Sequence, residues 1–230
     1  MSDVDRCELA PDEAWRQNVA ATESVRRASE SQRAWLVSLS SDYVFDGLKG
    51  QPYDELDELR PLSVYGRTKV ESERIVRGYE RGAVVRVSTL YGAGRTNFCD
   101  VAVERLRAGQ AVEAFTDQAT SPTFTDDVAM AIERLINAIV QQGRVPSPSV
   151  FHIANAGGCR RIDLVGRIAR LIGADPALIR PIRMDAQRRP ARRPACTILM
   201  SRFIHALTGS TLRPWERALE AYLRQRQWIN

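Results

Sequence analysis

Short apolar runs alternate with stretches of helical spacing along the first ninety residues. Residues 11–29 open with Pro-Asp-Glu, which is typical of a helix start because acidic side chains favour the positive end of the helix dipole. Residues 35–39 form an apolar run with polar flanks, as expected for a strand buried on both faces of a parallel sheet. Helical spacing returns over residues 64–79, and residues 83–87 are the next apolar run. This order predicts βαβ units and an α/β fold.

The same alternation of apolar runs and helical spacing continues to the end of the chain. Two proline-bearing segments, residues 144–148 and 188–194, are predicted to be surface loops. We expect a strand at residues 150–154 and helices at residues 98–108, 125–141, 162–172 and 215–226.

Composition narrows the class of protein. The 230 residues are 44% hydrophobic and 27% charged, which is ordinary for a globular chain long enough to bury a core. No apolar stretch approaches the roughly 18 to 20 residues of a membrane span, and residues 1–10 lack the basic and apolar blocks of a signal peptide. We therefore expect a cytoplasmic protein. The four cysteines stand far apart without a CxxC pair, which favours free thiols over disulfides or a metal site.

The net charge of +5 is partly local. A solvated loop and a site for a phosphate-bearing small molecule are equally compatible with the cluster that produces it. No nucleic-acid-binding motif accompanies the cluster, so nucleic acid is not an expected partner. The cluster consists of Arg188, Arg189, Arg192 and Arg193.

Tyr65 and Lys69 stand four positions apart near the start of a predicted helix, so their side chains share one helix face. A free tyrosine has a pKa of about 10, and a nearby ammonium group favours the phenolate. Ser41 follows a predicted strand, where its hydroxyl can bond to the carbonyl that Tyr65 protonates. Ligands of open α/β sheets bind beyond the carboxyl ends of the strands. The three residues are a candidate catalytic set, although the spacing also occurs where a half-buried tyrosine merely neighbours a solvated lysine.

Motifs around this set occur in the order typical of one family. The chain resembles the dTDP-4-dehydrorhamnose reductases, which are extended short-chain dehydrogenase/reductases that bind sugar nucleotides. The resemblance lies in SSDYVFDG (40–47), PYDE (52–55), Pro61, YGRTK (65–69), RVS (86–88), LYG (90–92), NF (97–98), DQ (117–118), SPT (121–123), DVA (127–129) and RRP (192–194).

For the fold, the resemblance implies an incomplete Rossmann-type parallel sheet with helices on both faces and a small C-terminal substrate lobe. It assigns residues 1–92 to the C-terminal part of a dinucleotide-binding Rossmann domain whose N-terminal strands are absent. Residues 93–230 are then mainly a substrate-binding lobe, with some elements that return to the Rossmann domain.

For the chemistry, the resemblance implies an oxidoreductase that uses NADPH or NADH to reduce a nucleotide-linked 4-keto-6-deoxy sugar, as in dTDP-rhamnose biosynthesis. Ser41 matches the residue that polarises the carbonyl, Tyr65 the proton donor, and Lys69 the residue that holds the nicotinamide ribose. Tyr65 and Lys69 thus contact the cofactor as well, as does the loop of Val87, Ser88, Thr89 and Leu90. The residues matched to substrate contacts are Ser41, Asn97, Gln118 and Arg193.

Two departures from the family concern the substrate. Thr89 stands where members that act on dTDP-4-keto-rhamnose often carry a tryptophan. Arg160 and Arg161 replace small polar and aromatic residues. The sugar and the chemistry of the lobe are therefore expected to differ from those of typical members.

A third departure concerns the cofactor. Family members begin with a strand, a Gly-rich turn and a helix whose amides bind the pyrophosphate. Here residues 2–8 match the part of the family's sequence that follows its fourth strand, and no Gly-x-x-Gly-x-x-Gly occurs in the chain. We therefore expect a truncated chain that lacks roughly 60 residues, about two βαβ units, with doubtful cofactor binding and activity on its own. Its expected partners are the nucleotide-sugar substrate and either a second copy, in a homodimer, or a complementing N-terminal fragment.

Two alternatives stay open. The regulatory beta subunit of methionine adenosyltransferase resembles the same family and also has a leucine before its Tyr-Gly, as Leu90 precedes Tyr91 here. This non-catalytic interaction role gains weight if the natural protein starts at Met1. The other alternative is a sugar-nucleotide epimerase, which shares the tyrosine and lysine pair but usually holds NAD tightly and has a different lobe.

Overall fold

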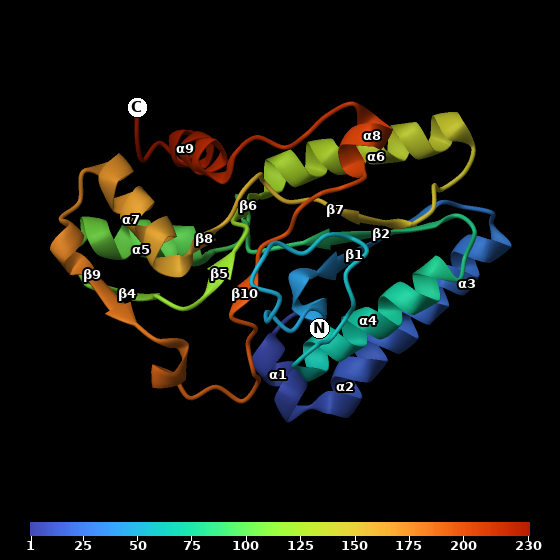
Figure 1. The fold of residues 1–230 in the computed structure, drawn as a ribbon, viewed down its shortest axis with the longest axis horizontal. Coiled ribbons are helices and arrows are strands. Elements are labelled where there is room, and N and C mark those ends of the chain that lie inside the picture. The colour runs from blue at the N-terminus through green and yellow to red at the C-terminus, as the bar shows by residue number, and fades with distance from the viewer.

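In the computed structural model of residues 1–230, a parallel sheet lies between two layers of helices (Figure 1). Its strands are β1 (Leu36–Ser41), β2 (Gly82–Val87) and β7 (Val150–His152), in the order β1-β2-β7. All of β2 is buried because it has neighbours on both sides. The register pairs Ser41 with Val87, so β1 and β2 end at the same edge of the sheet.

The helices on the two faces of the sheet pack against alternate residues of β2, as the period of two in a strand requires. Val84 packs with Val76 on one face, and Val85 packs with Leu135 and Ile139 on the other. On the first face lie α1 (Val4–Leu9), α2 (Pro11–Trp15), α3 (Ala21–Ser31) and α4 (Val64–Arg77), with a π-helical turn (Arg16–Ala20) between α2 and α3. The opposite face is covered by α6 (Thr125–Gln142) and α8 (Ile204–Thr208).

A second lobe has its own core of 17 buried residues, centred on Leu106, Ile168 and Tyr222. None of the helices in either lobe combines the length and the apolar composition needed to cross a bilayer. The lobe consists of α5 (Phe98–Arg107), α7 (Arg161–Ile172), α9 (Trp215–Gln225) and the parallel pair β4 (Val112–Phe115) and β9 (Ile179–Ile182).

Two small sheets of two-residue strands connect the lobes. One pairs β3 (Leu90–Tyr91) with β6 (Thr123–Phe124). The other has the order β10-β5-β8, with β5 in parallel to β10 and antiparallel to β8. Its strands are β5 (Ala119–Thr120), β8 (Cys159–Arg160) and β10 (Cys196–Thr197).

The predicted helices and strands are all present, with ends within one or two residues of the expected positions. The expectation that residues 35–39 are buried on both faces is wrong, because Leu39 is 49% exposed. β1 pairs with β2 alone and is therefore an edge strand of the sheet. The loop at residues 188–194 is only partly a surface loop. Ala191 is buried there, and Arg193 is held in an ion pair with Asp5 of α1.

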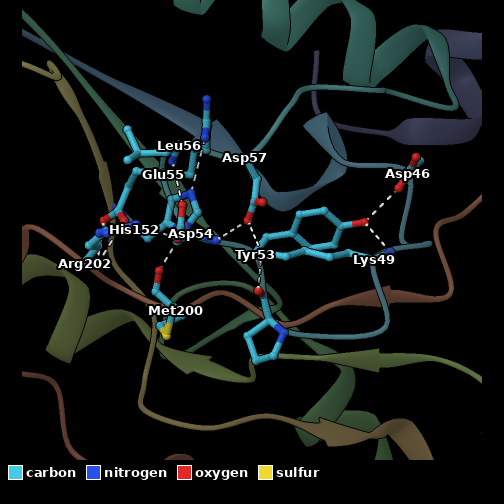
Figure 2. Close-up of polar contacts among 12 residues, drawn as sticks. Asp46, Lys49, Tyr53, Asp54, Glu55, Leu56, Asp57, His152, Met200 and Arg202 are labelled. Carbon is cyan, nitrogen blue, oxygen red and sulfur yellow. Dashed lines mark hydrogen bonds and ion pairs between the residues drawn. The ribbon is translucent and has the colours of Figure 1, made fainter.

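Hydrogen bonds join the loop between β1 and α4 to β7 and to residues 200–202, which precede α8 (Figure 2). The backbone carbonyl of Tyr53 accepts from the Met200 N–H at 2.8 Å. The buried Glu55 carboxylate accepts from the backbone N–H groups of His152 and Arg202, both at 2.9 Å. These bonds hold the segment that follows β1 against residues far away in the chain.

A buried ion pair crosses from α4 to β2. Arg86 donates to Glu73 through Nε at 2.9 Å and through Nη2 at 2.7 Å, and both side chains are 2% exposed. The Arg86 Nη1 also lies 3.3 Å from Nε2 of His152, whose Nδ1 lies 3.1 Å from the carbonyl of Met200. This pairing requires a neutral imidazole with its proton on Nδ1. Burial, followed by the charge of Arg86, lowers the pKa of His152 to about 3.

We expect His152 to make the protein less stable in acid. The unfolded chain binds a proton at His152 below pH 6.5, whereas the folded chain does so only near pH 3. The free energy of unfolding should therefore fall as the pH decreases between these values, with this group contributing up to about 1.4 kcal/mol per pH unit. Denaturant titrations at a series of pH values would show a shallower fall in His152→Gln. His205→Gln, which removes the other histidine, should keep the wild-type slope, and an unchanged slope in His152→Gln would contradict the assignment.

Candidate active site

Ser41 ends β1 and begins the site. Its extended backbone leads into a 3₁₀ turn (Asp42–Val44), which it caps by accepting from the Tyr43 N–H at 3.2 Å. The same hydroxyl donates to Oδ1 of Asp42 at 2.9 Å. Ser41 is half-buried at the edge where β1 and β2 end, so its hydroxyl is fixed in place beyond the carboxyl ends of the strands.

Asp42 is buried, and its carboxylate accepts hydrogen bonds from hydroxyl groups in three parts of the chain. Its Oδ2 accepts from Ser88, which follows β2, at 2.7 Å and from Thr197 of β10 at 2.6 Å, while Oδ1 accepts from Ser41. Burial raises the pKa of Asp42, and the bonds from Thr197, Ser88 and Ser41 oppose that rise. Asp42 thus ties β1, β2 and the segment from the second lobe together at one point.

The first turn of α4 lies against Tyr43. Ser63 caps the helix by accepting from the Gly66 N–H at 3.2 Å. A Cβ at Gly66 would lie 2.3 Å from the carbonyl oxygen of Tyr43, so this close approach requires glycine. The approach places the rings of Tyr43 and Tyr65 edge to face, with centroids 6.1 Å apart.

Lys69 lies one turn further along the same face of α4. Its Nζ donates to the carbonyl of Leu39 in β1 at 3.1 Å and lies 5.8 Å from the centre of the Tyr65 ring. The Ser41 hydroxyl lies close enough to the Tyr65 phenol to act on its pKa, although its own hydrogen bonds go to Asp42 and the Tyr43 N–H. The structure therefore brings Ser41, Tyr65 and Lys69 together, although they lie in two elements separated by a long loop.

The electrostatics of the pair differ from the sequence-based expectation. Burial raises the pKa of Tyr65 to about 12, and the bond with Ser41 only partly opposes that rise. Burial also lowers the pKa of Lys69, against the attraction of Glu73. The Lys69 ammonium points at the carbonyl of Leu39, and burial sets the direction of the pKa shift of Tyr65. In this state Tyr65 is a neutral phenol, which is the form that can donate a proton.

The loop that follows β2 combines buried and exposed residues. Val87 and Ser88 are buried, and Leu90 is 42% exposed. Thr89 has a φ of +40°, a left-handed conformation that is strained for a β-branched residue. Its carbonyl accepts from the Thr123 N–H at 3.0 Å, so the strained turn is anchored to β6.

The three substrate-lobe candidates differ in their surroundings. Asn97 caps α5, and its amide nitrogen donates to Gly92 and Tyr222 at 3.1 and 3.0 Å. Arg193 forms a bidentate ion pair with Asp5, with bonds of 3.0 and 2.9 Å. Gln118 is buried beside β5. Asn97 and Arg193 therefore have structural partners in this state, and their substrate contacts stay predictions.

Sequence reasoning missed Asp42, Thr197 and Asp5. A carboxylate that directly follows Ser41 at a strand end was a visible signal for Asp42. Thr197 and Asp5 carried no such signal, because their partners lie 155 and 188 positions away in the chain.

Comparison with known proteins identifies relatives of this arrangement. The model of the family described as RmlD substrate binding domain matches residues 1–228. The dTDP-4-dehydrorhamnose reductase of Mycolicibacterium smegmatis is 34% identical over 94% of this chain and 65% of its own length. That of Streptomyces griseus is 37% identical over 94% of this chain and 71% of its own length. A crystal structure of dTDP-4-dehydrorhamnose reductase from Bacillus anthracis, in complex with NADP, superposes with a TM-score of 0.90 at 26% identity, covering 98% of this chain and 78% of the other.

The fold and the site define a Rossmann-type α/β protein with a tyrosine and lysine pair beyond the end of its sheet. The chain belongs to the RmlD substrate binding domain family, which confirms the resemblance to dTDP-4-dehydrorhamnose reductases. It spans slightly less than two thirds of the Mycolicibacterium smegmatis relative, which is a longer protein.

The residues at the site fit one half of a nicotinamide dinucleotide. Lys69 bonds to a backbone carbonyl and has no carboxylate partner, so its remaining N–H groups suit ribose hydroxyls. No glycine of the site forms a pyrophosphate cradle. Gly92, which follows β3, instead packs on Thr125, since a Cβ there would lie 1.8 Å from the Thr125 Oγ1. The fit therefore covers the nicotinamide ribose.

We expect Asp42→Ala to destabilise the protein, because it leaves the hydroxyls of Ser88 and Thr197 buried without an acceptor. The free energy of unfolding should fall by about 1 to 3 kcal/mol. Urea denaturation of this variant and of Asp185→Ala gives the comparison. Asp185 is exposed, so its removal should change stability by less than about 0.5 kcal/mol. Equal free energies of unfolding in the two variants would contradict the central role of Asp42.

Proposed function

We propose that this chain carries the proton donor and the substrate lobe of an NADPH- or NADH-dependent reductase that acts on a nucleotide-linked 4-keto-6-deoxy sugar. The observation that carries the proposal is the convergence of Ser41, Tyr65 and Lys69 at the carboxyl end of the sheet in a member of this family. The names of the relatives support the substrate class, and the NADP complex of the Bacillus anthracis protein supports the cofactor.

When bound, the reduced nicotinamide supplies the hydride. The residues of this chain do the rest. Tyr65, neutral because burial raises its pKa to about 12, donates its proton to the oxygen of the sugar carbonyl. Ser41 turns its hydroxyl from Asp42 to the same oxygen and stabilises the developing charge. Lys69 holds the ribose and, once its ammonium lies beside the phenol, favours the phenolate that remains.

We assign residues 1–92 to the cofactor side and residues 93–230 mainly to the substrate side, with β7 and α6 returning to the first lobe. The pairing of β7 with β2 and the packing of α6 on that sheet support this division. The loop Val87 to Leu90 then lies beside the nicotinamide. Gln118 and, after release from their present partners, Asn97 and Arg193 are the proposed substrate contacts. A homodimer or a complementing N-terminal fragment is the proposed protein partner.

Tyr65→Phe should lower turnover of a dTDP-4-keto-6-deoxy sugar by roughly 10² to 10⁴, the range for losing a positioned acid. Turnover is best measured in a chimera in which the amino-terminal segment of the Streptomyces griseus reductase precedes residues 1–230. Tyr53→Phe is the matched control, because it removes a hydroxyl that bonds to Asp46 in the loop before α4. Unchanged turnover in Tyr65→Phe would exclude Tyr65 as the acid, and a wild-type chimera without activity would favour the regulatory alternative.

Lys69→Met should weaken NADPH binding as well as turnover, because its ammonium is proposed to hold the ribose. The Kd for NADPH, followed by fluorescence of the same chimera, should rise by about tenfold, as expected for the loss of a charge-assisted hydrogen bond. Lys49→Met, in the exposed loop before α4, is the control for the loss of one positive charge. If NADPH binds to Lys69→Met as it does to the wild type, Lys69 has no ribose contact.

A further inference from the structure

Arg161 is the first residue of α7 and has unusual surroundings for an arginine of this protein. Its guanidinium lies over the ring of Phe98, 4.4 Å from the centroid. Its Nη1 is buried and has no hydrogen-bond partner. The adjacent Arg160, by contrast, is exposed and forms a salt bridge with Asp163 at 2.8 Å.

The charge on Arg161 is poorly compensated. Burial lowers the pKa of its guanidinium, and the groups that oppose this shift are the thiols of Cys99 and Cys159 and the phenol of Tyr43. None of these groups is an anion near neutral pH, since burial raises the pKa of each thiol to about 12. Arg161 is half-buried, with one buried and unpaired nitrogen and no acidic partner, an arrangement that favours an anion at this place.

The position of Arg161 relates it to the active site. Its backbone N–H donates to the carbonyl of Gln118 at 2.9 Å, at the end of the small sheet β10-β5-β8. The same sheet contains Thr197, which bonds to Asp42. Tyr43 follows Asp42 in the chain, and its ring lies edge to face with the ring of Tyr65, with centroids 6.1 Å apart. The small sheet therefore links the arginine to the catalytic tyrosine.

Arg189 is a second cation that acts on Tyr43. Burial and the charge of Asp42 raise the pKa of Tyr43, and Arg193, Arg161 and Arg189 together oppose that rise. Arg193 is neutralised by Asp5. Arg189 is exposed and stacks over Phe115 at 5.1 Å, with a glutamine as its polar contact and no carboxylate. Arg161 and Arg189 thus act on the pKa of Tyr43 without a carboxylate partner of their own.

We propose that Arg161, assisted by Arg189, binds the diphosphate of the nucleotide-linked substrate. This inference rests on the proposed function, because a sugar whose carbonyl reaches Tyr65 has its diphosphate attached at the other side of the ring. A guanidinium binds two phosphate oxygens at once, and in a site shielded from water this pairing is strong.

The alternative is that Arg161 only packs on Phe98. Arg161→Met separates the two roles, because methionine still presents an apolar side chain to Phe98 and removes the charge. If the arginine awaits an anion, the ligand-free variant should melt at the same or a higher temperature than the wild type, since it loses an uncompensated buried charge. If the arginine is structural, the variant should melt at a lower temperature and bind ligands normally.

The experiment is calorimetric titration of residues 1–230 with dTDP and with inorganic pyrophosphate, without cofactor, at low ionic strength. We expect Arg161→Met to weaken binding of both ligands by about tenfold or more, as the loss of a bidentate charged contact predicts. Arg170→Gln is the control, because it removes one charge from an exposed position of the same helix. Equal affinity in the wild type and Arg161→Met, or a wild type that binds neither ligand, would overturn the inference.

The same variants distinguish this inference from the proposed function. A chimera that reduces the keto sugar with the same KM in Arg161→Met as in the wild type would contradict the diphosphate contact and leave the reductase function standing. Pyrophosphate binding that depends on Arg161, in a protein that reduces no keto sugar, would support the anion site and contradict the reductase.

Discussion

Three hydroxyl groups from three separate parts of the chain converge on one buried carboxylate, that of Asp42. Ser41 comes from β1, Ser88 from the end of β2, and Thr197 from the strand that returns from the second lobe. A buried carboxylate is tolerated only when donors satisfy its oxygens, so the three segments cannot separate without a large cost. The position of Ser41, and through Tyr43 that of α4, depends on this one group.

The approach of α4 to that centre depends on the absence of a side chain. Gly66 lets the backbone of α4 lie against the carbonyl of Tyr43. Because Tyr65 and Lys69 are four positions apart in this helix, their side chains share one of its faces. Both side chains are half-buried at this contact. This burial explains why Tyr65 holds its proton tightly although a lysine is its neighbour.

The long elements of the fold could be predicted from the sequence, because helices such as residues 64–77 span several periods of their apolar pattern. Strands of two residues, such as β5 and β10, have no period, so nothing in the sequence indicated them. The catalytic candidates were found because Tyr65 and Lys69 are local to one helix. Asp42 and Thr197 meet across 155 positions, and only the folded chain reveals such a contact.

The ion pair between Asp5 and Arg193 joins residues 188 positions apart. During synthesis α1 emerges from the ribosome 188 positions before the arginine that holds it. Until then α1 is held by the small cluster of Cys7, Ala14 and Val64 and by the bond from the Val64 N–H to Glu8. Helix α1 is therefore fully locked only after a partner made 188 positions later has joined it, and closing so long a loop slows this step of assembly.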